Sequence, residues 1–440
     1  MVSWLGTNRG AVGRLAGEGG WVLAGQVVAL GGSLIGIRII TSVISPDVFG
    51  QVALVLGMIS LSSDFFCAPI LHGVSRFFPN AQAAGRIASF RVLISRLLAR
   101  RVVFAASLLL AIGVGSEVYW RSQGTLIAFA LATGLLGLNT LRSFEMNLLN
   151  ASRRRRPFGI WSAVDAWLRP LGVWASVMLF GATAWTVMLG HAAGAAISNL
   201  AFRTSVVRGP GGVESGARWS RDLATEVLRF AAPLPPLALL GWSANLSDRY
   251  ILAAASGAEA AGIYAAAYAL ASAPFLAFAG VVNLTLQPVL FNAVAQGDRV
   301  RERRTLLLWL GAAAGGSCLG VALLAAFREP LVHLALAERF WGAAPILPWI
   351  GAAYALQAMR QAFEALILAD RRTRILTALQ LGGAVVGLAL YLILIPAYGA
   401  MGAAIATFCA FALTFAATAL GSRAAGRLRG RAVDEAGAGR

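Results

Sequence analysis

The sequence contains no lysine, so all 37 of its basic residues are arginine. Nucleotide-driven pumping through a P-loop requires a glycine-rich loop that ends in lysine, and this absence excludes that class of transporter. Charged residues of either sign make up only 13% of the 440 residues. Soluble domains carry about 25% charged residues, so the composition excludes an ordinary soluble protein.

Cysteine is also scarce. Cys67, Cys318 and Cys409 lie far apart in the chain, each inside an apolar run. This spacing matches neither a disulfide framework nor a set of metal ligands, and we expect small core residues, no metal and no cofactor. The formal net charge of +18 does not indicate nucleic-acid binding, because the arginines punctuate apolar segments instead of collecting in one basic region.

What the sequence has in excess is apolar length. Hydrophobic residues account for 58% of the chain, and the mean hydropathy is +0.72. Because about 20 apolar residues cross a bilayer as a helix, we predict an all-α polytopic membrane protein with twelve transmembrane helices. The predicted spans are residues 20–43, 50–71, 102–120, 124–148, 158–180, 184–205, 228–253, 262–290, 305–327, 343–368, 375–395 and 399–421.

The connections between these spans alternate between arginine-rich and nearly arginine-free. The arginine-rich ones hold Arg76 to Arg101, Arg153 to Arg156, Arg208 to Arg221, Arg299 to Arg304 and Arg371 to Arg374. Because cytoplasmic loops retain positive charge, the pattern predicts that both termini are cytoplasmic. The longest outer connection, 327–342, reads as a short surface-lying amphipathic helix, which leaves no room for a large external catalytic domain.

The two halves of the chain resemble each other weakly. Arg38 to Leu54 and Arg249 to Ala267 share an arginine, a small-residue turn, an acid and a following glycine, at offsets of 211 to 212. Six spans per half predict two six-helix bundles related by pseudo-twofold symmetry, with parallel repeats. The predicted divisions are an N-terminal bundle (1–207), a cytoplasmic linker (208–225), a C-terminal bundle (226–422) and a basic cytoplasmic tail (423–440).

A predicted helical hairpin from Pro233 to Ser272 carries the most distinctive polar group. Asn245, Asp248 and Arg249 are spaced i, i+3, i+4, which places them on one helical face among apolar residues. An arginine at the centre of a span costs about 2.5 to 3.5 kcal/mol on insertion scales, so it should face an interior, a partner or water.

Other spans carry similar polar stripes. Their members are Arg38, Asp64, Asn139, Arg142, Glu145, Asp165, Arg169, His191, Gln357, Arg360, Gln361 and Glu364. Because so many polar groups cannot all face lipid, we expect them to converge on a water-filled, net cationic cavity that binds the substrate. Asp64, Asp165, Asp248 and Glu364 are candidates for coupling transport to an ion.

A structural alternative stands beside each of these assignments. Asp165 with Arg169, Arg142 with Glu145, and Arg360 with Glu364 have the spacing of intrahelical ion pairs that only fix packing. Tyr264, Tyr268 and Ser272 form an i, i+4, i+8 stripe that would either pack tightly or stack on sugar rings.

Four stretches resemble the polysaccharide and oligosaccharidyl-lipid exporters, O-antigen-type flippases of the superfamily that also contains multidrug antiporters and lipid II flippases. They are SPDVFGQVALV (Ser45 to Val55), SDRYILAAASGAEAAGIYAAAYAL (Ser247 to Leu270), LADRRTRIL (Leu368 to Leu376) and IPAYGAMGAAIAT (Ile395 to Thr407). The resemblance implies a MATE-like and flippase-like fold in the bacterial cytoplasmic membrane. Arg38 and Arg249, with Arg142, Arg169 and Arg360, would match the family's cationic cavity residues. Only Asp248 and Arg249 lie in a matched motif.

The resemblance further implies transport of a polyprenyl-pyrophosphate-linked oligosaccharide, a surface polysaccharide precursor such as one for O-antigen or exopolysaccharide, from the inner to the outer leaflet. Its partners would be that lipid-linked substrate, the bilayer, and glycan polymerases or glycosyltransferases of the same pathway. A cation-coupled multidrug antiporter of the same fold would favour an acidic cavity. A membrane glycan polymerase or ligase would be an enzyme and would need a larger outer loop, whereas a scaffold would not need buried charges.

Overall fold

The computed structural model describes residues 9–120, 124–152, 154–207, 221–370 and 372–438. These residues are almost entirely helical, and no strand occurs among them. The chain forms two compact units, Met1–Leu239 and Leu240–Arg440, which are considered one at a time. The sequence-based division at 207, 225 and 422 stays a prediction, and most of its linker, residues 208–220, lies outside the described residues.

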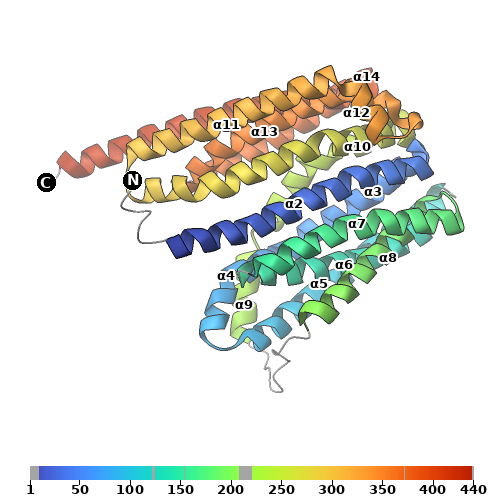
Figure 1. Ribbon diagram of the computed structural model, residues 1–440, viewed down its shortest axis with the longest axis horizontal. Coiled ribbons are helices and arrows are strands. Elements are labelled where there is room, and N and C mark those ends of the chain that lie inside the picture. The colour runs from blue at the N-terminus through green and yellow to red at the C-terminus, as the bar shows by residue number, and fades with distance from the viewer. Residues whose placement is uncertain (1–8, 121–123, 153, 208–220, 371, 439–440) are drawn as a thin grey trace. The chain divides into compact units, whose positions relative to one another are not determined.

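The first unit contains six long helical segments and one short helix (Figure 1). They are α2 (Arg9–Val43), α3 (Pro46–Ser62) with the π-helical turn η1 (Ser63–Cys67) and α4 (Ala68–Ala83), α5 (Ile87–Trp120), α6 (Thr125–Ala151), α7 (Arg155–Phe180), α8 (Ala184–Phe202) with the π-helical turn η2 (Arg203–Val207), and the short α9 (Arg221–Ala231). Helix α7 packs against both α2 and α8, and α6 packs against both α5 and α8.

The second unit also contains six long helical segments, because two of its helices are each broken at a glycine. Its elements are α10 (Pro235–Ala295), which begins in the last residues of the first unit, α11 (Arg299–Ala326), α12 (Arg328–Ala335), the 3₁₀ helix η3 (Glu338–Ile346), α13 (Leu347–Ala369) and α14 (Thr373–Ala438). Gly257 interrupts α10 and Gly399 interrupts α14. Each therefore consists of two arms, and α13 packs against α11 and α14.

Counting these arms separately gives six long segments per unit in the described part of the chain, in the order that the sequence predicted. Seven segments of the described residues are long and apolar enough to cross a membrane by length and composition, and two of the seven contain the broken helices α10 and α14. The all-helical, multi-pass membrane fold is thus confirmed.

Matching glycine turns support the internal repeat. Gly85 before α5 and Gly297 before α11 both have positive φ, of 66° and 69°, and are separated by the offset of 212 seen in the sequence. Gly181 (φ 88°) and Gly399 (φ 57°) end the fifth segment of each half and are 218 residues apart. Non-glycine residues rarely adopt positive φ. A glycine with positive φ thus recurs at corresponding places in both halves.

The helix that contains the third predicted span is longer than the span. Helix α5 begins at Ile87, fifteen residues before the predicted 102, because its arginine-rich first turns are also helical. Phe90, Leu93, Ile94, Leu97 and Leu98 form a buried stripe there and join the cluster that includes α4 and α9. Arginine is a good helix former, so an arginine-rich segment with an apolar face continues the helix beyond the membrane.

The connection 327–342 contains a short helix, as predicted. Helix α12 buries Val332 completely and leaves Leu334 77% exposed, and His333 stacks on Trp341 with ring centroids 3.9 Å apart. Its position at the outer membrane surface stays a prediction.

Candidate functional site

Close helix packing positions the polar residues of the first unit. A Cβ at Gly36 of α2 would lie 2.4 Å from Pro170 of α7, and one at Gly190 of α8 would lie 2.4 Å from the Cα of Val173. The indole of Trp167 also donates a 3.2 Å hydrogen bond to the backbone carbonyl of Val28. Small residues thus allow α2, α7 and α8 to form one tightly packed block, from which Asp165 and Arg169 project.

Arg169 connects α7 to α6. Its Nε lies 2.9 Å from Oδ2 of Asp165, and its Nη2 donates to Oδ1 of Asn139 at 2.8 Å. Both partners of the ion pair are about one-fifth exposed. The structure therefore forms the intrahelical pair that the spacing allowed and adds an amide acceptor from a neighbouring helix, so this group fixes the α6–α7 contact.

The structural alternative predicted an ion pair between Arg142 and Glu145. This prediction was wrong. Arg142 donates to the backbone carbonyl of Trp161 and lies over the ring of Phe202 at 5.5 Å, and the residue is only 6% exposed. Glu145 instead pairs with Arg91 of α5. Glu145 thus meets a side chain of α5 and Arg142 a backbone carbonyl of α7, and sequence spacing alone cannot detect such neighbours. One guanidinium nitrogen of Arg142, Nη1, is buried without an acceptor.

In the second unit, Asp248 lies in a hydrogen-bonded network between the arms of both broken helices. Its Oδ2 accepts from the hydroxyl of Tyr264 at 2.6 Å, and its Oδ1 accepts from the backbone N–H of Arg249 at 2.8 Å. The Tyr264 hydroxyl also lies 3.2 Å from Thr407, which is 3.3 Å from the hydroxyl of Tyr391. At 1% exposure the carboxylate is sealed, which favours a structural role for it in this conformation.

Arg249 has no acid at ion-pair distance among the described residues. Its guanidinium lies over the ring of Tyr268 at 4.9 Å, and its Nε is buried without a hydrogen-bond acceptor. Tyr268 in turn shares a 2.8 Å hydrogen bond with Tyr354. Because Tyr264 and Tyr268 are 0% and 6% exposed, the tyrosine stripe packs inside the unit, in agreement with the packing alternative.

The stripe on α13 is the least satisfied polar group of the second unit. Nη1 of Arg360 lies 3.3 Å from Oε1 of Glu364, yet that oxygen has no hydrogen bond of acceptable geometry. Nε of Arg360 and Oε1 of Gln357 are also buried without partners, while Gln361 is half-buried on the same helix. Buried polar atoms are almost always hydrogen-bonded in proteins, so these unmet groups on one helix make the stripe a candidate site for a polar ligand.

The remaining predicted residues are more dispersed. Arg38 is exposed on α2, and Asn245 is exposed on α10 with its amide bonded to the carbonyl of Gly241. Asp64 lies in the π-helical turn η1 and accepts from Ser60 at 3.1 Å, and His191 is half-buried on α8. The structure thus brings together Asn139, Asp165 and Arg169 in one unit and Gln357, Arg360 and Glu364 in the other.

One relationship between the two halves was not predicted from the sequence. Asn139 and Arg142 of α6 correspond to Gln357 and Arg360 of α13 at the offset of 218 that also relates Gly181 to Gly399. An amide followed three residues later by arginine therefore recurs in the fourth long segment of each half. The shared offset was present in the sequence, because the arginine-rich loops after these helices have it too.

The described residues contain no group of three or more His, Cys, Asp or Glu side chains placed to hold a metal ion, and the three cysteines are free. The long apolar helical segments of the described residues define a multi-pass helical membrane protein, and solved structures share the fold. The lipid II flippase MurJ in an inward closed conformation matches with a TM-score of 0.68 and 12% identity over 92% of this chain and 87% of that one. An inward-facing multidrug resistance MATE family transporter of the MOP superfamily matches with a TM-score of 0.63 and 13% identity, covering 94% of this chain and 96% of that one.

An outward-facing MATE family transporter also matches, with a TM-score of 0.60 and 14% identity over 94% of this chain and 95% of that one. No curated protein sequence matches the chain. The model of the polysaccharide biosynthesis protein family matches residues 15–294, more than half of the chain, and the protein belongs to that family.

Proposed function

We propose that the protein is a flippase that moves a polyprenyl-pyrophosphate-linked oligosaccharide from the cytoplasmic to the outer leaflet. The observation that carries this proposal is the set of buried guanidinium nitrogens without acceptors, one each on Arg142, Arg249 and Arg360. A buried donor without a partner costs about 1 to 3 kcal/mol. A phosphate oxygen would satisfy such donors with charge-assisted, forked hydrogen bonds.

The depths of the arginines support a passage for an anion. At 1.5 Å per residue, Arg249 lies about 12 Å from the turn at Gly257, on the side predicted to be outside. On the same scale, Arg360 lies about 20 Å from the start of α13. Within the second unit, these two arginines at different depths would receive the pyrophosphate in turn while the headgroup crosses by alternating access. The inward-facing and outward-facing states of the MATE family transporters support that kind of movement.

The pairing of the charged groups favours this proposal over a cation-coupled multidrug antiporter. Glu145, Asp165 and Glu364 each have an arginine partner, and Asp248 accepts from Tyr264 in a buried network. Arg142 and Arg249 take part in none of the ion pairs of the described residues, and each has a buried guanidinium nitrogen without an acceptor. Unmet donors of this kind suit an anionic cargo.

An ion-coupling role for Asp64 is a secondary proposal. Asp64 lies in the π-helical turn η1 and accepts from Ser60 of α3, and such turns are frequent at functional sites.

A leaflet-exchange assay tests the proposal. The purified protein is reconstituted in vesicles with a polyprenyl-pyrophosphate-linked trisaccharide that carries a nitrobenzoxadiazole label, and dithionite bleaches only label in the outer leaflet. We expect bleaching beyond one half of the label with the wild type and not with Arg249→Ala. Arg303→Ala, which removes an exposed arginine of α11, is the matched control and should keep wild-type exchange. Equal exchange by Arg249→Ala and wild type would contradict the proposal.

A further inference from the structure

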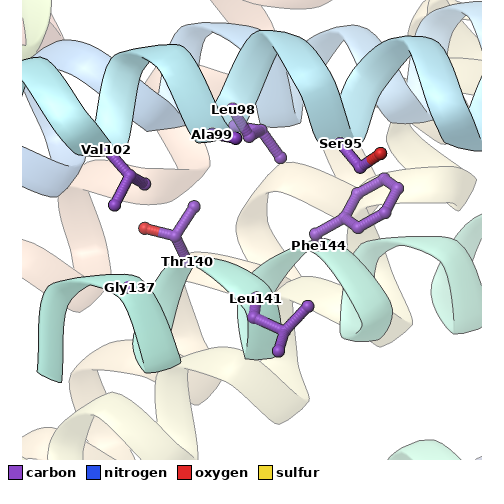
Figure 2. A pocket seen from close by; sticks show the side chains of 8 residues that line it. All are labelled: Ser95, Leu98, Ala99, Val102, Gly137, Thr140, Leu141 and Phe144. Atoms are coloured by element: carbon purple, nitrogen blue, oxygen red, sulfur yellow. The ribbon is translucent and has the colours of Figure 1, made fainter. Parts of the chain in front are cut away.

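A lateral groove of about 190 Å³ lies between α5 and α6 of the first unit (Figure 2). It is lined by Ser95, Leu98, Ala99, Val102, Gly137, Thr140, Leu141 and Phe144. Figure 2 shows the side chains of Ser95 and Val102 facing those of Thr140 and Phe144 across the groove. No residue of this groove belongs to the polar groups described above, so the groove requires an explanation of its own.

The groove walls favour an apolar occupant. The Ser95 hydroxyl already donates to the carbonyl of Val92 at 3.0 Å, and the Thr140 hydroxyl donates to that of Leu136 at 2.8 Å. A Cβ at Gly137 would meet only Val102, at 3.8 Å. This glycine therefore leaves space and is not needed for helix contact, unlike Gly36 and Gly190. Water requires two to four polar partners in such a space, and these walls offer few.

The depth of the groove places it in one leaflet. Gly137 to Phe144 lie about 18 to 29 Å from the first residue of α6 at 1.5 Å per residue. A bilayer's hydrocarbon core is about 30 Å thick. The groove therefore occupies the half of the core nearer the arginine-rich connections, which the arginine distribution predicts to be cytoplasmic.

Positive charge lies at the end of the groove nearest the headgroups. Arg91, one turn before Ser95 on the same face of α5, pairs with Glu145 of α6 at this end. The Arg91 side chain is 38% exposed, whereas that of Glu145 is 6% exposed, so the arginine is the more exposed partner of the pair. Arg96, next to Ser95, is exposed at the same end.

The opposite face of α6 excludes the proposed cargo as the occupant. Gly137, Thr140 and Phe144 share one helical face, whereas Asn139 and Arg142 point the other way, toward Arg169 and Trp161 of α7. A lipid whose headgroup lay at Arg142 could not also place its chain in the groove without passing around the helix. An occupant with its own anionic headgroup at Arg91 meets no such obstacle.

We propose that the α5–α6 groove binds an anionic phospholipid of the arginine-rich leaflet, with one acyl chain in the groove and its phosphate beside Arg91 and Arg96. The lipid fills the space that Gly137 and Ala99 leave and holds the extended first turns of α5 against α6. The site is independent of what the protein transports.

The test compares lipids and a groove-filling variant. Purified protein in detergent receives dioleoyl phosphatidylglycerol or dioleoyl phosphatidylcholine, which share acyl chains but differ in charge. Bound lipid is counted by native mass spectrometry, and the Tm is recorded. We expect phosphatidylglycerol to bind at least tenfold more tightly and to raise the Tm, because a ligand of the folded state stabilises it.

Gly137→Leu fills the groove, and Gly134→Leu, at an exposed position of the same helix with nothing within 4 Å of its Cβ, is the control. Without lipid both variants should melt near the wild type. Only Gly137→Leu should lose the tight binding of phosphatidylglycerol and the rise in Tm that it causes. Should Gly137→Leu fail to fold, Ala99→Leu, which fills the groove from α5, replaces it. Arg96→Ala should reduce the preference for phosphatidylglycerol to less than threefold.

Three results would overturn the proposal. The first is equal binding of the two phospholipids by the wild type, and the second is an undiminished phosphatidylglycerol effect in both groove-filling variants. The third is displacement of bound phosphatidylglycerol by equimolar undecaprenyl phosphate, which would assign the groove to the cargo's lipid chain. Because the readout is lipid binding, failure here leaves the exchange assay of the proposed function unaffected.

Discussion

The hydroxyl of Tyr264 donates a 2.6 Å hydrogen bond to Oδ2 of Asp248, across the hairpin that Gly257 forms in α10. Thr407 lies 3.2 Å from the same hydroxyl and extends the network to the second hairpin, in α14. A buried carboxylate thus links two helical hairpins of one unit. An unsatisfied charge in this place would be costly, so the network should control the stability of the C-terminal unit.

Tyr264→Phe should lower stability. The substitution keeps the ring and removes the hydroxyl that donates to Asp248, at a cost of about 1 to 3 kcal/mol for a buried group left without its partner. Thermal unfolding in detergent would measure this loss as a lower Tm. Tyr398→Phe is the control, because Tyr398 is 64% exposed. Indistinguishable melting of the two variants would argue against a stabilising network.

Arg169→Ala should weaken the first unit, since it leaves the partly buried carboxylate of Asp165 without a cation and Asn139 without its donor. We expect a loss of about 1 to 3 kcal/mol. The double variant Asp165→Asn with Arg169→Gln replaces the ion pair by two neutral amides, and it should recover part of the lost stability. Chemical denaturation of the variants in one detergent provides the comparison. A double variant less stable than Arg169→Ala would show that the ion pair is not the source of the effect.

Gly190→Val should disrupt the α7–α8 contact, because even its Cβ would lie 2.4 Å from the Cα of Val173, where backbone has to move. Overpacking of this kind costs about 1 to 3 kcal/mol. Gly311→Val, in open space on α11, should change the Tm little. The yield of folded protein by size-exclusion chromatography and the Tm together measure the difference, and similar behaviour of both variants would contradict the close approach.

Arg360→Ala and Glu364→Ala separate binding from packing on α13. If this stripe binds the pyrophosphate, Arg360→Ala should slow leaflet exchange at least tenfold, because a charge-assisted hydrogen bond contributes about 1.5 to 3 kcal/mol. Glu364→Ala should keep exchange and loosen only the contact with Arg360. Full activity of the double variant would identify the stripe as structural. Membrane insertion and Tm of each variant serve as controls.

Membrane potential should change the direction of exchange. Moving about two negative charges out of a negative interior gains roughly 4 to 5 kcal/mol per 100 mV across the full field, at about 2.3 kcal/mol per charge. A potassium diffusion potential, negative on the arginine-rich side, should therefore accelerate outward exchange, and the reversed potential should slow it. An outward exchange rate that is the same under both potentials would mean that no net negative charge crosses with the cargo.

The sequence alone determined the class of fold and much of its order. Apolar length and the alternation of arginine-rich connections fix twelve spans, because hydrocarbon accepts only long apolar helices and the loops retain their charge. The glycine turns at 85 and 297 recur at the offset of 212 that the sequence predicted. The pairing of Asp165 with Arg169 also followed from spacing, since residues four apart meet on one helical face.

Only the tertiary structure decided the roles of the other polar groups. Glu145 meets Arg91 rather than Arg142, and Asp248 meets Tyr264 and, through it, Thr407. These partners lie on different helices, and their meeting depends on how helix faces are rotated against one another, which periodicity within a single helix does not specify. For the same reason the groove between α5 and α6 had no signature in the sequence. It exists because Ala99 and Gly137 face each other across two packed helices.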